Sequence, residues 1–271
     1  MNELMKIAYE DKSKILQYAN KGLMGCEKQV IIPQLTRNDK VLDVGCFVGR
    51  VTFELSKLVD EIVGIDISET GIQYSNSQKE ANGIVNAKFL LCSASNIPLS
   101  DKYFDKIIIP YNGIEDVSPE SERQKVFVEL EKKLSNKGVL IFSIHNKYYF
   151  RWYFHILILN AVRSASKVSH KSILKMISKF KNENAAKLLL SGEKDSIVWK
   201  EPDSKEYLQH FFYSHKKIVK QLTLAGFKID RLISIEDQNP HSQEGLSKGV
   251  ISKKLPSFLI PGFYIISSKV Y

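Results

Sequence analysis

The chain has 271 residues, of which 44% are hydrophobic and 25% charged, a composition typical of a folded protein with room for one large α/β domain and an insertion. Its three cysteines, Cys26, Cys46 and Cys92, are odd in number and lack metal-ligand spacing, which excludes a disulfide framework and a zinc site and predicts reduced thiols. The net charge is +9, because residues 147–271 carry 21 Lys and Arg against 10 Asp and Glu, whereas residues 1–146 carry 18 against 20.

The N-terminus is charged and has no apolar signal core, and no apolar run of the chain is long enough to cross a bilayer. We therefore expect a cytoplasmic protein. Apolar residues at helical spacing predict an amphipathic helix over residues 3–20. A second helix is expected over residues 27–35, with an interruption near Pro33.

From residue 40 onward, apolar strands alternate with helical segments. The pattern predicts strands at 40–45, 61–66, 87–92, 104–109 and 139–144, and helices at 49–58, 69–81 and 118–134. Ser118 is expected to cap the last of these helices. Such alternation favours a parallel sheet covered by helices on both faces, and the loops that follow its strands gather at one edge.

Residues 147–204 interrupt the alternation and divide the chain into parts 1–146, 147–204 and 205–271. Six aromatic residues lie within 148–154, too many for one helix face, and a lysine-rich helical pattern follows. A basic amphipathic insertion of this kind has three interpretations: a helical cap over a substrate pocket, a homodimer contact through residues 147–190, or a peripheral membrane contact. RNA binding is disfavoured, because no RNA-binding module is present.

After the insertion the alternation returns. The pattern predicts a helix at 214–225, a strand at 227–235 and a last strand within 258–269.

The stretch Val41-Leu-Asp-Val-Gly-Cys-Phe-Val-Gly-Arg50 combines a strand, a glycine turn and the start of a helix. This arrangement presents backbone N–H groups and a positive helix end to a charged small molecule. Asp43, an acid within an apolar strand, is costly unless it has partners. Asp66 ends the next strand, where an acid can accept both hydroxyls of a ribose, as it does in dehydrogenases. The dinucleotide spacing fails, however, because Phe47 and Arg50 replace two of its three glycines, and the Walker lysine is absent.

Three motifs in register resemble the class I S-adenosylmethionine-dependent methyltransferases that act on small molecules. They are Val41-Leu-Asp-Val-Gly-Cys-x-x-Gly49, Gly64-Ile-Asp66-Ile-Ser68, and Ala94-Ser-Asn-Ile-Pro98 with Tyr103-Phe104-Asp105. The resemblance covers about residues 27–146 and 205–269. It implies a Rossmann-like α/β fold with a seven-stranded, mostly parallel sheet in the order 3-2-1-4-5-7-6, strand 7 being antiparallel. It also implies S-adenosyl-L-methionine as cofactor and S-adenosyl-L-homocysteine as product.

The same resemblance implies roles for individual residues. Asp43 would support the glycine loop and the cofactor's ammonium group, Asp66 would bind the ribose, and Tyr111 would lie near the sulfonium. Two residues depart from the family pattern: Phe47 replaces a glycine and narrows the pocket, and Ser93 replaces an Asp that receives the adenine amino group. The implied cofactor-binding set is Tyr18, Asp43, Gly45, Cys46, Phe47, Gly49, Asp66, Ile67, Ser93, Ala94 and Tyr111.

Methyl transfer depends mainly on positioning, and a hydroxyl acceptor also needs a base. The candidates on the loops after the fourth and fifth strands are Tyr111, Asn112, Glu115, Asp116 and His145, with His145, Tyr111 and Asp116 as the catalytic set. His145 is the preferred base because imidazole titrates near neutrality. A structural histidine and plain turn chemistry at Asp116 are the alternatives.

The expected function is methylation of a small or medium-sized metabolite at oxygen. A sugar, a natural product or a lipid-linked intermediate would be a suitable acceptor. The alternatives are N-methylation of a small molecule or peptide, a non-catalytic binding protein on the same fold and, less favoured, RNA methylation.

Overall fold

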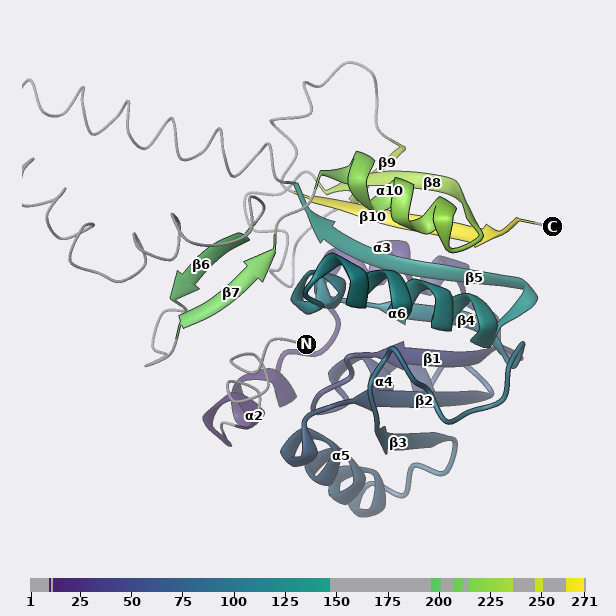
Figure 1. Ribbon diagram of the computed structural model, residues 1–271. Coiled ribbons are helices and arrows are strands. Elements are labelled where there is room, and N and C mark those ends of the chain that lie inside the picture. Colours follow the sequence, from purple (N-terminus) through teal and green to yellow (C-terminus); the bar gives the residue numbers. More distant parts are fainter. Residues whose placement is uncertain are drawn as a thin grey trace, which may run out of the picture.

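The computed structural model describes residues 10, 12–146, 196–200, 207–211, 214–235, 247–250 and 262–270 (Figure 1). Its main sheet has the strand order β3-β2-β1-β4-β5-β10-β8-β9. The bounds are β1 Lys40–Val44, β2 Glu61–Asp66, β3 Ala87–Leu91, β4 Phe104–Ile109, β5 Leu134–His145, β8 Phe227–Ile235, β9 Ser247–Val250 and β10 Gly262–Lys269.

Strands β1 to β5 run parallel to their neighbours, whereas β10 pairs antiparallel with both β5 and β8. The predicted order 3-2-1-4-5-7-6 with an antiparallel seventh strand is therefore confirmed. The short strand β9 extends the sheet by one strand beyond β8. Because β1, β2, β4 and β5 are parallel, their carboxyl ends meet at one edge of the sheet.

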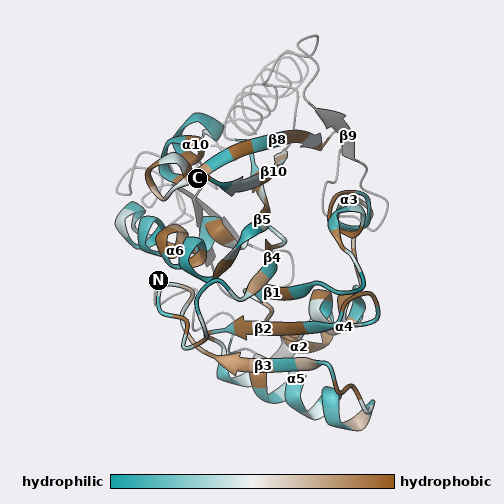
Figure 2. Ribbon diagram, turned by 90° about the vertical axis from the view of Figure 1, so that its right-hand side faces the viewer, coloured by the Kyte–Doolittle hydropathy of each residue, from teal (hydrophilic) through white to brown (hydrophobic). Residues whose placement is uncertain are grey.

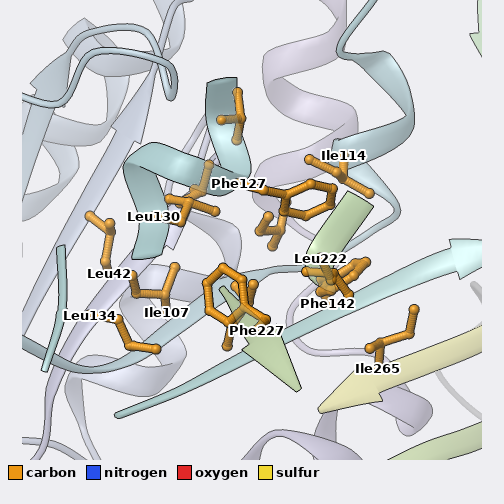
Figure 3. Close-up of a cluster of buried hydrophobic side chains, with 14 of the residues drawn as sticks. Leu42, Ile107, Ile114, Phe127, Leu130, Leu134, Phe142, Leu222, Phe227 and Ile265 are labelled. Carbon is orange, nitrogen blue, oxygen red and sulfur yellow. The ribbon is translucent and has the colours of Figure 1, made fainter. Parts of the chain in front are cut away.

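Helices cover both faces of this sheet, as Figure 2 shows for α6 and α10 on one side and α3 and α4 on the other. The hydrophobic core is correspondingly divided in two. One half packs residues of α6 and α10 against the sheet, including Phe127, Leu130 and Leu222 (Figure 3). The other half packs residues of α3, α4 and α5 against the opposite face. The helix bounds are α2 Lys12–Ala19, α3 Gly25–Val30, α4 Arg50–Ser56, α5 Glu69–Ala81, α6 Glu120–Lys133 and α10 His215–Leu224, with short 3-10 turns η1 Ile32–Gln34 and η2 Gly113–Asp116.

The start of α6 differs from the sequence prediction. Pro119, in an extended conformation, occupies the N-cap position, and no side chain caps the helix. The predicted cap at Ser118 is therefore wrong, because the chain enters the helix one residue later than a Ser118 cap requires. Ser68, in contrast, does cap α5 and accepts a hydrogen bond from the Gly71 backbone N–H.

A separate two-stranded antiparallel sheet is formed by β6 Ser196–Lys200 and β7 Tyr207–Phe211. This hairpin extends across residue 205, the expected boundary of the insertion, and β7 lies against η2. Within the expected helical cap, residues 147–204, the structure describes only 196–200, and these form strand β6. The segment 147–190, expected to make a dimer contact, and the proposed membrane contact lie outside the described residues. Among the helices that the structure does describe, none is sufficiently long and apolar to cross a membrane.

Candidate active site

The loop after β1 turns sharply before α4 begins. Gly45 and Gly49 have positive φ angles of 76° and 74°, which glycine adopts without steric cost. A Cβ atom at Gly49 would lie 2.7 Å from a ring carbon of Phe53, whereas a Cβ atom at Gly45 would meet nothing within 4 Å. The turn at Gly49 is therefore packed against α4, and the turn at Gly45 faces open space.

Asp43 is fully buried at the end of β1. Its Oδ2 accepts a hydrogen bond from the Thr52 hydroxyl at 2.6 Å, but its Oδ1 has no hydrogen-bond partner among the described residues. Burial raises the pKa of Asp43 to about 7, against the lowering effects of the Thr52 hydrogen bond and the Arg50 charge. A buried carboxylate oxygen without a donor is costly, so this atom is the place where a cationic ligand group is most needed.

A buried ion pair lies next to Asp43. Arg50, the first residue of α4, donates to both carboxylate oxygens of Glu27 at 2.6 Å and to the Gly22 carbonyl at 2.7 Å. Glu27 also accepts a hydrogen bond from the Met24 backbone N–H at 2.8 Å. The pair therefore ties α3 to the glycine loop. Sequence reasoning missed it, because an acid and a base 23 residues apart form no local pattern.

Asp66, at the carboxyl end of β2, bridges two backbone segments. Its Oδ2 accepts from the Phe47 N–H and its Oδ1 from the Ser68 N–H, each at 2.8 Å. Burial raises its pKa, and the two backbone N–H groups oppose this effect. Since a carboxylate accepts up to about four hydrogen bonds, Asp66 is suited to receive a pair of ligand hydroxyls as well. Ile67 follows it in the wall of the same cavity.

Three aromatic rings pack together at the glycine loop. The Tyr18 ring of α2 lies edge-on to the rings of Phe47 and Tyr111, with centroids 5.7 Å apart in both cases. Phe47 and Tyr111 have left-handed φ angles of 46° and 55°, a costly conformation for aromatic residues that clusters at functional sites. The Lys21 ammonium lies 4.4 Å from the Tyr18 centroid, and the Arg50 guanidinium lies 5.5 Å from that of Tyr111.

One cavity of about 140 Å³ connects these groups. It brings together most of the residues that the sequence pointed to, although Gly49, Ser93 and His145 are not in its wall. Asp116 of η2 does line it. The predicted residues in the wall are Tyr18, Asp43, Gly45, Cys46, Phe47, Asp66, Ile67, Ala94, Tyr111 and Asp116.

Ser93 lies in an exposed turn after β3. Its hydroxyl is 2.9 Å from the Ser95 hydroxyl and accepts a hydrogen bond from the Ser95 backbone N–H at 3.3 Å. Ser93 lines a second cavity, which shares Ile67 and Cys92 with the first. The two cavities therefore meet at the ends of β2 and β3.

Glu115 and His145 form a pair beside η2. Glu115 is fully buried; one of its oxygens accepts from the His145 backbone N–H at 2.8 Å and the other lies 2.6 Å from His145 Nδ1. The Asn112 amide nitrogen is 3.1 Å from His145 Nε2. An amide N–H can only donate, so this contact makes Nε2 the acceptor nitrogen of the ring. The ring proton is then on Nδ1, which donates a hydrogen bond to Glu115. Sequence reasoning had proposed these residues singly, since only the pairing of β4 with β5 brings them together.

Comparison with known proteins gives consistent results. A family model described as a methyltransferase domain matches residues 35–215. An uncharacterized protein from Methanocaldococcus jannaschii is 24% identical over 212 residues, 78% of this chain and 70% of its own length. A ubiquinone/menaquinone biosynthesis C-methyltransferase from Proteus mirabilis is 30% identical over 130 residues, 45% of this chain and 51% of its own.

Solved structures show the same fold. The crystal structure of a SAM-dependent methyltransferase from Methanosarcina mazei superposes with a TM-score of 0.61 at 21% identity, covering 89% of this chain and 97% of that one.

Proposed function

The chain belongs to the class I S-adenosylmethionine-dependent methyltransferases, and we propose that it methylates an oxygen atom of a small or medium-sized metabolite. The enzyme class, the cofactor and a small-molecule substrate follow from the family. The acceptor atom and the residues that serve it are the proposal.

The cavity fits this cofactor. Asp43 Oδ1 is a buried carboxylate oxygen without a donor among the described residues and suits the ammonium group, while the open space at Gly45 leaves room for the methionine part. Asp66 would receive the ribose hydroxyls, and Ile67 and Ala94 would pack against the adenine. When bound, S-adenosylmethionine supplies a methyl group on a positively charged sulfur, already a strong electrophile.

The aromatic cluster would shape the reacting end of the cavity. The rings of Tyr18, Phe47 and Tyr111 would exclude water, and the π face of an aromatic ring attracts a cation. Phe47, which departs from the family's glycine, belongs to this cluster. We assign these three rings the role of holding the charged sulfur centre in a fixed, dry environment.

The Glu115–His145 pair is the observation that favours oxygen over nitrogen as the atom that accepts the methyl group. A hydroxyl must lose its proton as it attacks, whereas a neutral amine already presents a lone pair. Glu115 holds the His145 ring by Nδ1, so Nε2 is the nitrogen that would take the hydroxyl proton, once the acceptor hydroxyl displaces the Asn112 amide from it. Glu115 would then stabilise the resulting imidazolium. The His145 side chain is 15% exposed, which leaves part of the ring accessible to an acceptor. Tyr111 and Asp116, which line the cavity near this pair, would orient that acceptor.

The insertion would cover the acceptor. Residues 147–204 follow β5, which ends at His145, and precede β7, which lies against η2. The strand before the insertion therefore ends at the proposed base, and β7 packs against the turn that contains Glu115. We propose a cap over the substrate in preference to a dimer or membrane contact.

The experiment screens hydroxylated metabolites and amines with S-adenosylmethionine that carries a 13C-labelled methyl group, and NMR locates the label in the product. We expect the label on oxygen. His145→Gln should slow transfer by about 10²–10⁴-fold, with unchanged binding of S-adenosylhomocysteine by calorimetry. Glu115→Gln should slow transfer less and change the pH dependence of the rate. A label on nitrogen or carbon, or an unchanged rate in His145→Gln, would overturn the proposal.

A further inference from the structure

The second cavity, of about 230 Å³, lies between the ends of β2 and β3 and Glu10. It shares Ile67 and Cys92 with the first cavity, so the two adjoin. Its wall also contains Glu10, Glu69, Leu91 and Ser93. Glu10 is distant in sequence from every other residue of either cavity wall except Tyr18, and no sequence motif included it.

The geometry of the first cavity directs a nucleoside towards the second. An acid at the end of the second strand is placed to bind ribose hydroxyls, and Asp66 occupies that position. A base attached to this ribose would lie against Ile67, which both cavities share, and its edge would face the second cavity.

The amino group of an adenine in this place needs an acceptor, since a donor left without a partner on burial costs binding free energy. The Ser93 hydroxyl is a poor candidate, because it is an uncharged acceptor in an exposed turn. Glu69 is also poorly placed: its side chain is exposed and its Oε1 is 3.2 Å from the Gln73 amide nitrogen on the same helix.

Glu10 is held in a defined orientation at this cavity. Its Oε1 accepts from the Glu69 backbone N–H at 2.8 Å and its Oε2 from the Thr70 backbone N–H at 3.1 Å, so α5 fixes both oxygens. A carboxylate has acceptor capacity beyond two hydrogen bonds, and a charged acceptor binds an N–H more strongly than a hydroxyl does. The acid of this site would therefore be Glu10, in place of a carboxylate in the turn after β3, where Ser93 stands.

We propose that Glu10 receives the adenine amino group of the cofactor and makes the protein selective for adenine, an inference that rests on the cofactor assignment. One consequence is that Glu10, a residue that precedes α2, contributes directly to cofactor affinity.

The test compares two ligands in each variant by calorimetry: S-adenosylhomocysteine, and S-inosylhomocysteine, in which a carbonyl replaces the amino group. Wild-type protein should prefer the adenosyl ligand by about tenfold or more. Glu10→Gln should lose this preference, because its amide can donate to the inosine carbonyl. The ratio of the two affinities is insensitive to partial unfolding, since both ligands bind the same folded fraction.

Glu69→Gln is the matched control, as it changes an acid in the same cavity wall and should retain the preference. An unchanged preference in Glu10→Gln, or its loss in Glu69→Gln or Ser93→Ala, would overturn the assignment to Glu10. Failure of the wild-type protein to bind either ligand would instead refute the cofactor assignment on which it rests.

Discussion

Replacing Asp43 by Asn removes a carboxylate that is fully buried between the glycine loop and α4. Burial raises the pKa of Asp43 from 3.8 to about 7 in the folded protein. The folded state therefore holds the proton more tightly than the unfolded chain, and stability is lost as the pH rises from about 4 to about 7. The shift of about three units corresponds to at most about 4 kcal/mol.

Over the pH range in which unfolding is readily measured, the expected loss of stability is smaller. Between pH 5 and pH 8 the linkage relation gives a loss of about 2–3 kcal/mol for the wild-type protein, and Asp43→Asn should not show this loss. The variant should therefore gain about 2–3 kcal/mol relative to wild type over this pH interval. The absolute stability of the variant at any one pH also depends on the new amide group. In the wild-type protein Asp43 Oδ1 has no hydrogen-bond partner among the described residues, so an amide N–H₂ in its place would also lack one.

The assay is urea unfolding of the ligand-free protein at pH 5 and pH 8. Glu54→Gln is the control, because Glu54 lies in an exposed ion pair on α4, the helix that packs against Asp43. At pH 8 Asp43→Asn should also bind S-adenosylhomocysteine about 10- to 100-fold more weakly, the usual cost of a lost hydrogen bond to a charged group. A stability difference between variant and wild type that stays constant from pH 5 to pH 8 would refute the reasoning about burial. Unweakened binding would refute the role of Asp43 towards the ammonium group.

Two further changes test the packing of the site. Glu27→Gln leaves the Arg50 charge buried without its partner carboxylate. The protein should therefore be destabilised by about 3–5 kcal/mol. A loss of unfolding free energy below about 1 kcal/mol in urea unfolding would contradict this expectation. Phe47→Gly and Phe47→Ala both remove the ring from its contact with Tyr18, but only glycine relieves the positive φ angle. Phe47→Gly should therefore be the more stable of the two by about 1 kcal/mol, and the opposite order in urea unfolding would disprove strain at this position.

Much of the fold could be predicted from the sequence because its signals are local. Apolar periodicity gave β2, α5 and β8 with their observed bounds, since the spacing of buried side chains depends directly on the backbone repeat. The order of the sheet was implied by the resemblance to class I methyltransferases, which three motifs in register carry. The acids Asp43 and Asp66 were also recognisable, because each interrupts or ends an apolar strand beside glycines.

Only the tertiary structure decided which distant side chains meet. The pairs Glu27–Arg50 and Glu115–His145 join residues that are 23 and 30 positions apart, and no periodicity encodes such contacts. The predicted cap of α6 was wrong for a related reason. Ser118 has a suitable side chain, but the extended backbone at Pro119 determines where the helix begins. Glu10 reaches α5 across 59 positions. The sequence thus specified the strands, the turns and the cofactor class, whereas long-range packing determined which charged groups face each other at the ends of those strands.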